Sequence, residues 1–204
     1  MKQLISTIFL ILYTCIGFSQ NVTFDISTSY LFTKLTLKGA NVIDKRSNQS
    51  SDLRQAVSIG LNTKISKNFY FKTEAGTNSF EDVIQMEYTN TFGKFNFFER
   101  YSREQWYFAI LPEWRPFEKT PVYINGGWSI YQTFGASGLV GKNTKKSRTG
   151  IMINLGATPI LTENLGCIVN LGYTYVQGMS DHIDSPTIST KQINVKFGFV
   201  YIIK

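Results

Sequence analysis

Apolar and polar residues alternate with a period of two through most of this chain. From residue 22 onward, eight stretches carry an apolar or aromatic residue at every second position. This is the period of a β-strand, whose successive side chains point to opposite faces, and no segment here shows the longer period of an amphipathic helix. The stretches are 22–32, 53–65, 69–77, 106–114, 122–130, 151–157, 165–175 and 193–203. The pattern predicts an all-β, antiparallel protein.

The residues between the apolar positions indicate which face is buried. The apolar set holds most of the large aromatic residues, such as Trp106 and Phe197, whereas the alternate positions combine charged residues with glycine. A soluble sandwich or lipocalin-like barrel turns its apolar face inward. Charge mixed with glycine suits a crowded polar interior better than an open surface. We therefore expect a barrel with its apolar face toward lipid and its polar face inside.

The expected interior carries both signs of charge. An eight-stranded barrel is only wide enough for its own side chains, so we expect these residues to pair and fill the lumen rather than line an open pore. They are Arg54, Lys72, Glu74, Glu113, Arg115 and Lys196.

Short and long connections alternate along the chain. The short ones are 66–68, 116–121 and 162–164, and the long ones are 38–52, about 80–103, 135–149 and 177–190. Short periplasmic turns and long extracellular loops are typical of an outer-membrane barrel, which must be closed because backbone groups in lipid need partners within the sheet. We predict an eight-stranded transmembrane β-barrel. The segment 80–103 leaves an alternative: it extends two strands beyond the membrane, which we prefer, or forms an extra hairpin around Gly93, giving ten strands.

The first residues have the order of a secretory signal peptide. Lys2 gives a positive start, 4–18 is mainly apolar, and Gly17 and Ser19 are small residues at the −3 and −1 positions of a cleavage site. We predict a cleaved signal peptide at 1–19 and a barrel domain at 20–204. An uncleaved anchor and a lipoprotein modified at Cys15 are the alternatives. Cleavage would leave Cys167 as a single cysteine, and we expect it to be a small apolar strand residue.

The end of the chain resembles the terminal-strand assembly signal of outer-membrane barrels. It reads Lys196-Phe197-Gly198-Phe199-Val200-Tyr201-Ile202-Ile203-Lys204. Together with 65–69, 107–114 and 122–127, it makes the chain resemble the small outer-membrane β-barrel domain family of Bacteroidetes-type bacteria, which includes PorT-like proteins. The resemblance implies a fold and a location in the cell outer membrane. It does not imply one activity, because this architecture carries several.

Candidate chemistry is sparse. The chain has 204 residues, 17% of them charged, and a single histidine, His182, which argues against catalytic dyads and histidine-based metal sites. His182 lies among Ser and Asp residues at 180–185, but neighbours along a loop rarely converge on one atom. The glycines at 135–141 lack the spacing of a phosphate-binding loop. We expect no catalytic residue, no cofactor and no metal.

A basic run in the third long loop suggests a contact with lipopolysaccharide. The formal net charge is +7, and four of the basic residues are Lys142, Lys145, Lys146 and Arg148. Cations in an outer loop would attract lipopolysaccharide phosphates. The alternative is an ordinary solvated loop.

Aromatic residues are candidates for the girdles at the two membrane interfaces. These are Trp106, Trp114, Trp128, Tyr131, Tyr173 and Tyr201.

These observations lead to one main hypothesis about function. We expect a non-enzymatic outer-membrane barrel with a structural, adhesion or envelope-assembly role through its outer loops. Its expected partners are outer-membrane lipid, lipopolysaccharide and the outer-membrane assembly machinery. We expect a monomer and no nucleic-acid binding, since no basic–aromatic binding module is present. The alternatives are a lipid A-modifying barrel enzyme and a soluble periplasmic barrel that binds a small apolar ligand.

Overall fold

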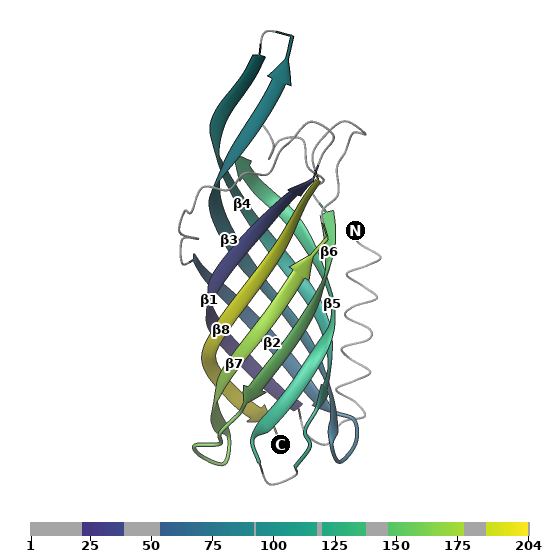
Figure 1. Ribbon diagram of the computed structural model, residues 1–204. Helices are drawn as coiled ribbons and strands as arrows, with labels where there is room; N and C mark the ends of the chain where they lie inside the picture. The colour runs from purple at the N-terminus through teal and green to yellow at the C-terminus, as the bar shows by residue number, and fades with distance from the viewer. Residues whose placement is uncertain are drawn as a thin grey trace.

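The computed structural model describes residues 22–38, 54–91, 93–117, 120–137, 147–177 and 187–203. They form a closed antiparallel barrel of eight strands in sequence order (Figure 1). The strands are β1 (Val22–Lys38), β2 (Arg54–Lys64), β3 (Phe69–Asn90), β4 (Gly93–Trp114), β5 (Val122–Ser137), β6 (Ser147–Ala157), β7 (Leu165–Val176) and β8 (Thr187–Ile203). The predicted eight-stranded barrel is confirmed. Within the same residues, no helix has the length and apolar character needed to span a membrane.

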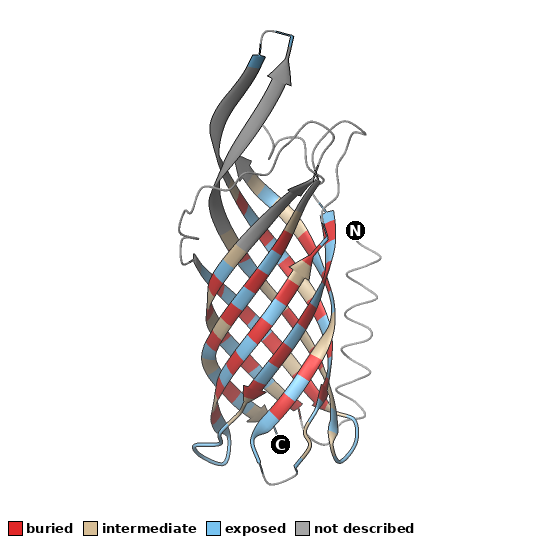
Figure 2. Cartoon of the chain, viewed as in Figure 1, coloured by how far each residue is buried: buried red, intermediate tan, exposed pale blue. Residues whose placement is uncertain are grey.

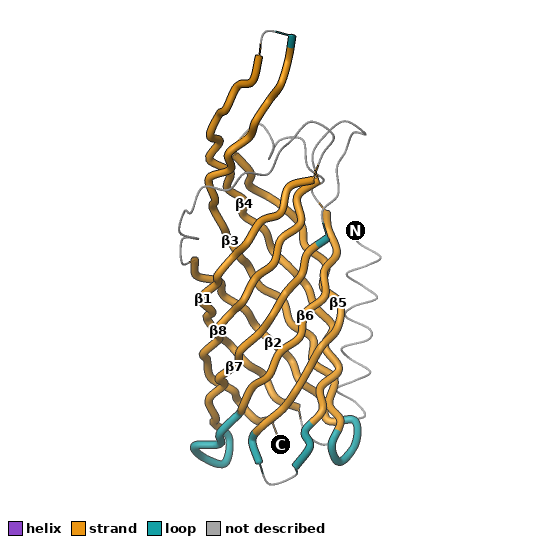
Figure 3. The backbone as a smooth tube through the Cα atoms, viewed as in Figure 1, coloured by secondary structure: helices purple, strands orange, loops and turns teal. Residues whose placement is uncertain are grey.

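The pairing of β1 with β8 closes the barrel. It runs without a break from Val22↔Ile203 to Lys38↔Thr187. The end that holds Val22 and Ile203 also holds the three short turns, between β2 and β3, β4 and β5, and β6 and β7 (Figure 3). In the first of these turns, the Ser66 amide donates to the Phe69 carbonyl at 3.1 Å. In an outer-membrane barrel this is the periplasmic end.

The segment 80–103 is a continuation of β3 and β4 and not an irregular loop. The two strands pair from Phe69↔Trp114 to Asn90↔Gly93, and Gly93 has a positive φ of 134° where the chain reverses. A positive φ is readily adopted only by glycine. The β2 partners of β3 end at Thr77, and the β5 partners of β4 begin at Ser102. The intervening part is a two-stranded ribbon above the wall (Figure 1). The preference for eight strands with tall extensions is confirmed.

Burial alternates along the strands in the inverted sense that the sequence predicts (Figure 2). In β6, Ile151 and Ile153 are about half exposed, whereas Met152 and Asn154 are buried at 5% and 4% exposure. Large apolar side chains therefore cover the outside, whereas the inside holds most of the buried polar side chains together with some apolar ones such as Met152. An apolar coat around a closed sheet is the surface that hydrocarbon requires.

One glycine permits a close approach between β4 and β5. Along these two strands the pair Ile110↔Trp128 is followed by the pair Glu113↔Asn125, and Pro112 lies between the two pairs. Proline has no N–H to donate to a ladder. A Cβ on Gly127 would collide with the backbone carbonyl of Ile110, whereas a Cβ on the adjacent Gly126 would have its nearest atom, the Met152 carbonyl oxygen, at 3.3 Å.

This difference predicts unequal effects for two neighbouring substitutions. Gly127→Ala should destabilise the barrel by about 1–3 kcal/mol, because overpacking must displace backbone. Gly126→Ala should destabilise the barrel clearly less, since the contact between its Cβ and the Met152 carbonyl oxygen needs to relax by only a few tenths of an ångström. Urea unfolding of both variants in detergent micelles, followed by heat-modifiable gel mobility, measures the difference. Equal urea midpoints for the two variants would contradict the close approach of β4 to β5 at Gly127.

Candidate functional site

The lumen is held by a four-residue charge network between β1, β3 and β8. Lys72 Nζ lies 2.9 Å from Asp25 Oδ2 and 3.2 Å from Glu74 Oε2. Lys196 Nζ forms an ion pair with the other Glu74 oxygen, Oε1. The Tyr107 hydroxyl of β4 donates to the same Oε1 at 2.7 Å. Two cations and two carboxylates thus balance one another inside the wall.

The network follows from local strand geometry combined with closure. Lys72 and Glu74 are two residues apart on β3, so both point inward. Asp25 and Lys196 come from the strands that close the barrel, and all four side chains are at most 5% exposed. A buried charge is tolerated only when it is paired and hydrogen-bonded. Removing one partner should therefore cost far more than removing an exposed carboxylate.

A second polar cluster lies nearer the periplasmic end, around Glu113. Its Oε1 accepts from Asn62 Nδ2 at 3.0 Å and from Arg115 Nε at 2.9 Å, and its Oε2 accepts from Asn125 Nδ2 at 3.3 Å. Asn154 Nδ2 extends the chain of hydrogen bonds to Asn125 Oδ1 at 2.7 Å. The cluster joins β2, β4, β5 and β6 across the interior.

The expected interior charges are largely found inside. Lys72, Glu74, Glu113 and Lys196 are buried, whereas Arg115 is only partly buried at the periplasmic mouth. The side chain of Arg54 lies outside the described residues. The described side chains leave a hollow of about 20 Å³ in the middle of the lumen, bordered by Tyr107, Tyr131 and Lys196. That is room for about one water molecule.

Arg148 is in the lumen and not in an outer loop, which corrects the prediction for this residue. It is 2% exposed on β6, and its guanidinium donates to Gln105 Oε1 at 3.2 Å and to Thr190 Oγ1 at 3.4 Å. The strand begins earlier than the apolar pattern indicates, and Arg148 is in phase with the inward-facing Met152. Lys142, Lys145 and Lys146 lie outside the described residues, as does His182 with the rest of 180–185.

Tyr131 is also inside, which corrects its assignment to an aromatic girdle. It is 1% exposed and packs on Tyr107 with ring centroids 5.6 Å apart. The neighbouring Ile130 occupies the outward position, so alternation places Tyr131 inward. The other girdle candidates do point outward and are exposed: Trp106, Trp114, Trp128, Tyr173 and Tyr201.

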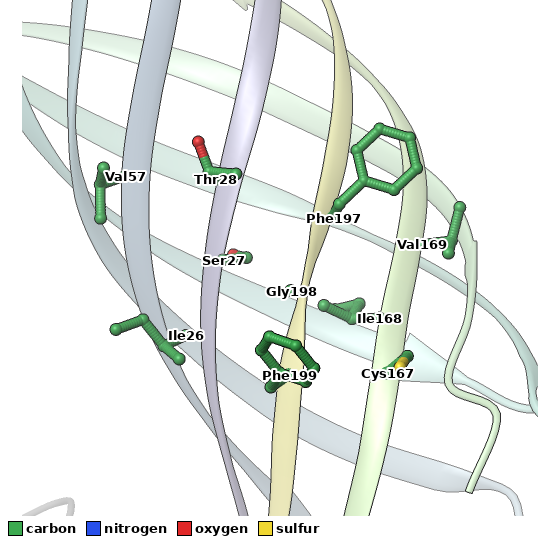
Figure 4. A pocket seen from close by; sticks show the side chains of 10 residues that line it. All are labelled: Ile26, Ser27, Thr28, Val57, Cys167, Ile168, Val169, Phe197, Gly198 and Phe199. Carbon is green, nitrogen blue, oxygen red and sulfur yellow. The ribbon is translucent and has the colours of Figure 1, made fainter. Parts of the chain in front are cut away.

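The outer wall has an apolar hollow of about 530 Å³ across β2, β1, β8 and β7 (Figure 4). Its outward side chains include Ile26, Phe197 and Phe199. Cys167 borders it, is partly exposed and is a free thiol, in keeping with a small apolar strand residue. The hollow belongs to the lipid-facing belt. Among the described residues, no group of three His, Cys, Asp or Glu side chains could hold a metal ion.

Comparison with known proteins bears on the fold. No protein-family model matches the sequence, and no curated protein matches it. The outer membrane protein OprG from Pseudomonas aeruginosa has a similar structure, with a TM-score of 0.57 and 11% sequence identity over 91% of this chain and 96% of that chain. The Neisserial surface protein A structure has a TM-score of 0.48 and 10% identity over 89% of this chain and 95% of that chain. The fold shared with OprG and the apolar belt of this barrel support the predicted outer-membrane location. The chain has the fold of a small outer-membrane β-barrel.

The charge network predicts a large difference between two carboxylate-to-amide substitutions. Glu74→Gln should destabilise the barrel by about 3–5 kcal/mol. Of the two carboxylates in the network, Asp25 alone would then remain to balance the two buried cations, Lys72 and Lys196. Glu104→Gln on the exposed side of β4 is the matched control and should change stability by less than about 1 kcal/mol. Urea unfolding in lipid vesicles, monitored by tryptophan fluorescence, compares them. Similar midpoints for the two variants would show that the network is not needed for stability.

Proposed function

We propose that this protein is a closed, non-enzymatic outer-membrane anchor that presents the β3–β4 ribbon for adhesion to a protein surface. The observation that carries the proposal is the length of the ribbon beyond the barrel. Residues 82–90 of β3 pair with residues 93–101 of β4, and neither β2 nor β5 continues alongside them. At about 3.3 Å per residue, such a ribbon reaches roughly 30 Å from the wall.

The ribbon is amphipathic by register. Directly opposite residues of an antiparallel pair share a face. One face contains the pairs Asp82↔Tyr101, Ile84↔Glu99, Met86↔Phe97 and Tyr88↔Phe95. The other face contains Val83↔Arg100, Gln85↔Phe98, Glu87↔Asn96 and Thr89↔Lys94. Six of these eight residues on the first face are apolar or aromatic, against two of eight on the second.

This pattern is suited to contact with another protein. An isolated two-stranded ribbon is at best marginally stable in water, and an apolar face that is covered by a partner gains stability. Its free edges also offer backbone donors and acceptors for strand addition. The residues of the apolar face lie on the side of β3 that, within the wall, faces the lumen. That side is polar in the wall and apolar in the ribbon, so the alternation reverses where the chain leaves the membrane. Such a reversal is expected of a segment selected for contact outside lipid.

The packed lumen supports an anchor more than a channel or an enzyme. Among the described residues, side chains from several strands meet inside, and one hollow between them has a volume of about 20 Å³. A substrate or solute of ordinary size has no room there. We further propose a monomer whose contacts are outer-membrane lipid, lipopolysaccharide at Lys142, Lys145 and Lys146, and the outer-membrane assembly machinery. We also propose that the chain belongs to the PorT-like Bacteroidetes-type family, and the sequence of its terminal strand supports this.

The packed lumen predicts electrical silence. The purified barrel in a planar lipid bilayer should give no discrete single-channel steps, because ions would have to displace the paired side chains of Lys72, Glu74 and Lys196. A general porin inserted in the same bilayer is the positive control. Reproducible steps that scale with the amount of barrel inserted would contradict the anchor.

The ribbon predicts a loss of adherence when it is removed. Replacing residues 82–101 by Asn-Gly joins the paired residues Glu81 and Ser102 by a two-residue hairpin turn and leaves the barrel wall unchanged. Cells that display this variant should adhere to protein-coated surfaces several-fold less than cells that display the full chain. Equal surface levels and heat-modifiable mobility establish that the shortened barrel is folded.

Two paired substitutions distinguish the contribution of the apolar face to adherence from that of the whole ribbon. Met86→Thr with Phe97→Thr changes one cross-strand pair on the apolar face, and Gln85→Thr with Phe98→Thr changes the next pair on the opposite face. The first pair should reduce adherence as strongly as the deletion, and the second should leave most of it. Adherence that is insensitive to both pairs and to the deletion would refute the proposal.

A further inference from the structure

The small hollow in the middle of the lumen is bordered by polar groups from opposite walls of the barrel. Its volume is about 20 Å³, and each of the eight strands contributes at least one lining residue. Ala56 and Met152 form apolar parts of the lining, whereas Asn78, Asn194 and Lys196 form polar parts. These three polar residues are at most 5% exposed. A molecule in this hollow must therefore satisfy polar groups that bulk water does not reach.

Asn78 on β3 brings an unpaired acceptor to the hollow. Its Nδ2 donates to Gln192 Oε1 at 3.3 Å, and Gln192 Nε2 donates in turn to Thr33 Oγ1 at 3.3 Å. This chain of donors fixes the orientation of the Asn78 amide, because Gln192 Oε1 needs a donor. Asn78 Oδ1 is then left without a hydrogen-bond donor among the described residues. A buried carbonyl oxygen in this position requires a partner.

Asn194 on β8 brings a second unpaired acceptor. It lies directly opposite Gly172 of β7 in the register of the two strands. A Cβ at Gly172 would collide with both Oδ1 and Nδ2 of Asn194, so the glycine provides the space that this amide occupies on the inner face of the sheet. Within the described part of the chain, Asn194 Oδ1 accepts no hydrogen bond. Two buried carbonyl oxygens thus belong to side chains that border the same hollow.

Lys196 indicates which kind of molecule fits. Its ammonium group forms an ion pair with Glu74 and has three N–H donors in all. This ammonium group would repel a cation in the hollow, and the two carbonyl oxygens would repel an anion. A neutral molecule that can donate two hydrogen bonds and accept one matches all three groups. Water has this capacity, and the hollow has the volume and the number of polar partners that one buried water needs.

We propose that the hollow binds one water molecule that joins two separate groups of hydrogen bonds. The water donates to Asn78 Oδ1 and to Asn194 Oδ1, and it accepts from Lys196 Nζ. Through Asn78 it connects to the amide chain that ends at Thr33, nearer the outer end of the barrel. Through Lys196 it connects to the four-residue charge network. The polar interior then becomes one continuous hydrogen-bonded unit, and water is part of its structure.

Nuclear magnetic resonance of the intact barrel in detergent micelles tests for this water. Ala56 and Met152 both line the hollow, and their methyl groups can be labelled with carbon-13. Magnetisation transfer from water to both methyl groups should give nuclear and rotating-frame Overhauser effects of opposite sign, which identify a water held inside the protein. A crystal structure of the barrel should show one water within about 3.2 Å of Asn78 Oδ1, Asn194 Oδ1 and Lys196 Nζ.

Two substitutions of equally buried asparagines provide the comparison. Asn194→Leu removes one acceptor and should abolish the transfer to both methyl groups. Asn170→Leu is the matched control and should retain it, because Asn170 is 3% exposed on β7 but does not line the hollow. Both variants keep the lining tyrosine hydroxyls and the lining lysine, so signal relayed through their exchanging protons cannot produce the difference. If Asn194→Leu does not fold, Asn78→Leu removes the other acceptor and gives the same comparison.

Three results would overturn the proposal. Absence of the transfer in the full chain would show that no water is held there. Transfer that survives the loss of either acceptor would refute the assigned hydrogen bonds. An anomalous diffraction signal at the hollow in crystals soaked in rubidium chloride would identify a cation instead of water. Heat-modifiable mobility establishes that each variant is folded, and adherence through the ribbon is measured independently.

Discussion

Every backbone N–H and C=O group that enters hydrocarbon needs a hydrogen-bond partner, and the seam between β1 and β8 provides the last of these partners. Because this seam runs from Val22↔Ile203 to Lys38↔Thr187 without interruption, the sheet has no edge within its wall. Closure then assigns every strand position to one of two environments, lipid or lumen. The inverted alternation of apolar and polar residues is the consequence, and a slip of one residue would place charges in lipid.

Closure also determines how charge is accommodated. The lumen of an eight-stranded barrel is too narrow to hydrate its side chains freely, so they must satisfy one another. Glu74 contacts Lys72, Lys196 and Tyr107 together, and Glu113 on β4 accepts hydrogen bonds from side chains of β2 and β5. These contacts connect strands that are far apart around the wall. They join the wall across its interior into one support, which suits the proposed anchor for an external ribbon.

The two ends of this support differ for a physical reason. At the outer end, β3 and β4 leave the membrane and lose the neighbours that constrain the rest of the sheet, so the ribbon is free to carry an apolar face into water. At the inner end, short turns joined by backbone hydrogen bonds complete the wall. Contact with a partner is thus proposed at the outer end.

The strands, their number, the short turns and the face toward lipid can all be predicted from the amino-acid sequence, because a period of two and turn residues are local properties. It also placed Lys72, Glu74, Glu113 and Lys196 inside. The predictions for Arg148 and Tyr131 are wrong, because strict alternation along the strand determines the side of the wall on which a residue lies, whatever the expected loop bounds or the aromatic character of its side chain. Which charges meet is evident only in the folded barrel, since partners such as Glu74 and Lys196 are 122 residues apart. Their distance depends on closure and register across the lumen, which no local pattern encodes.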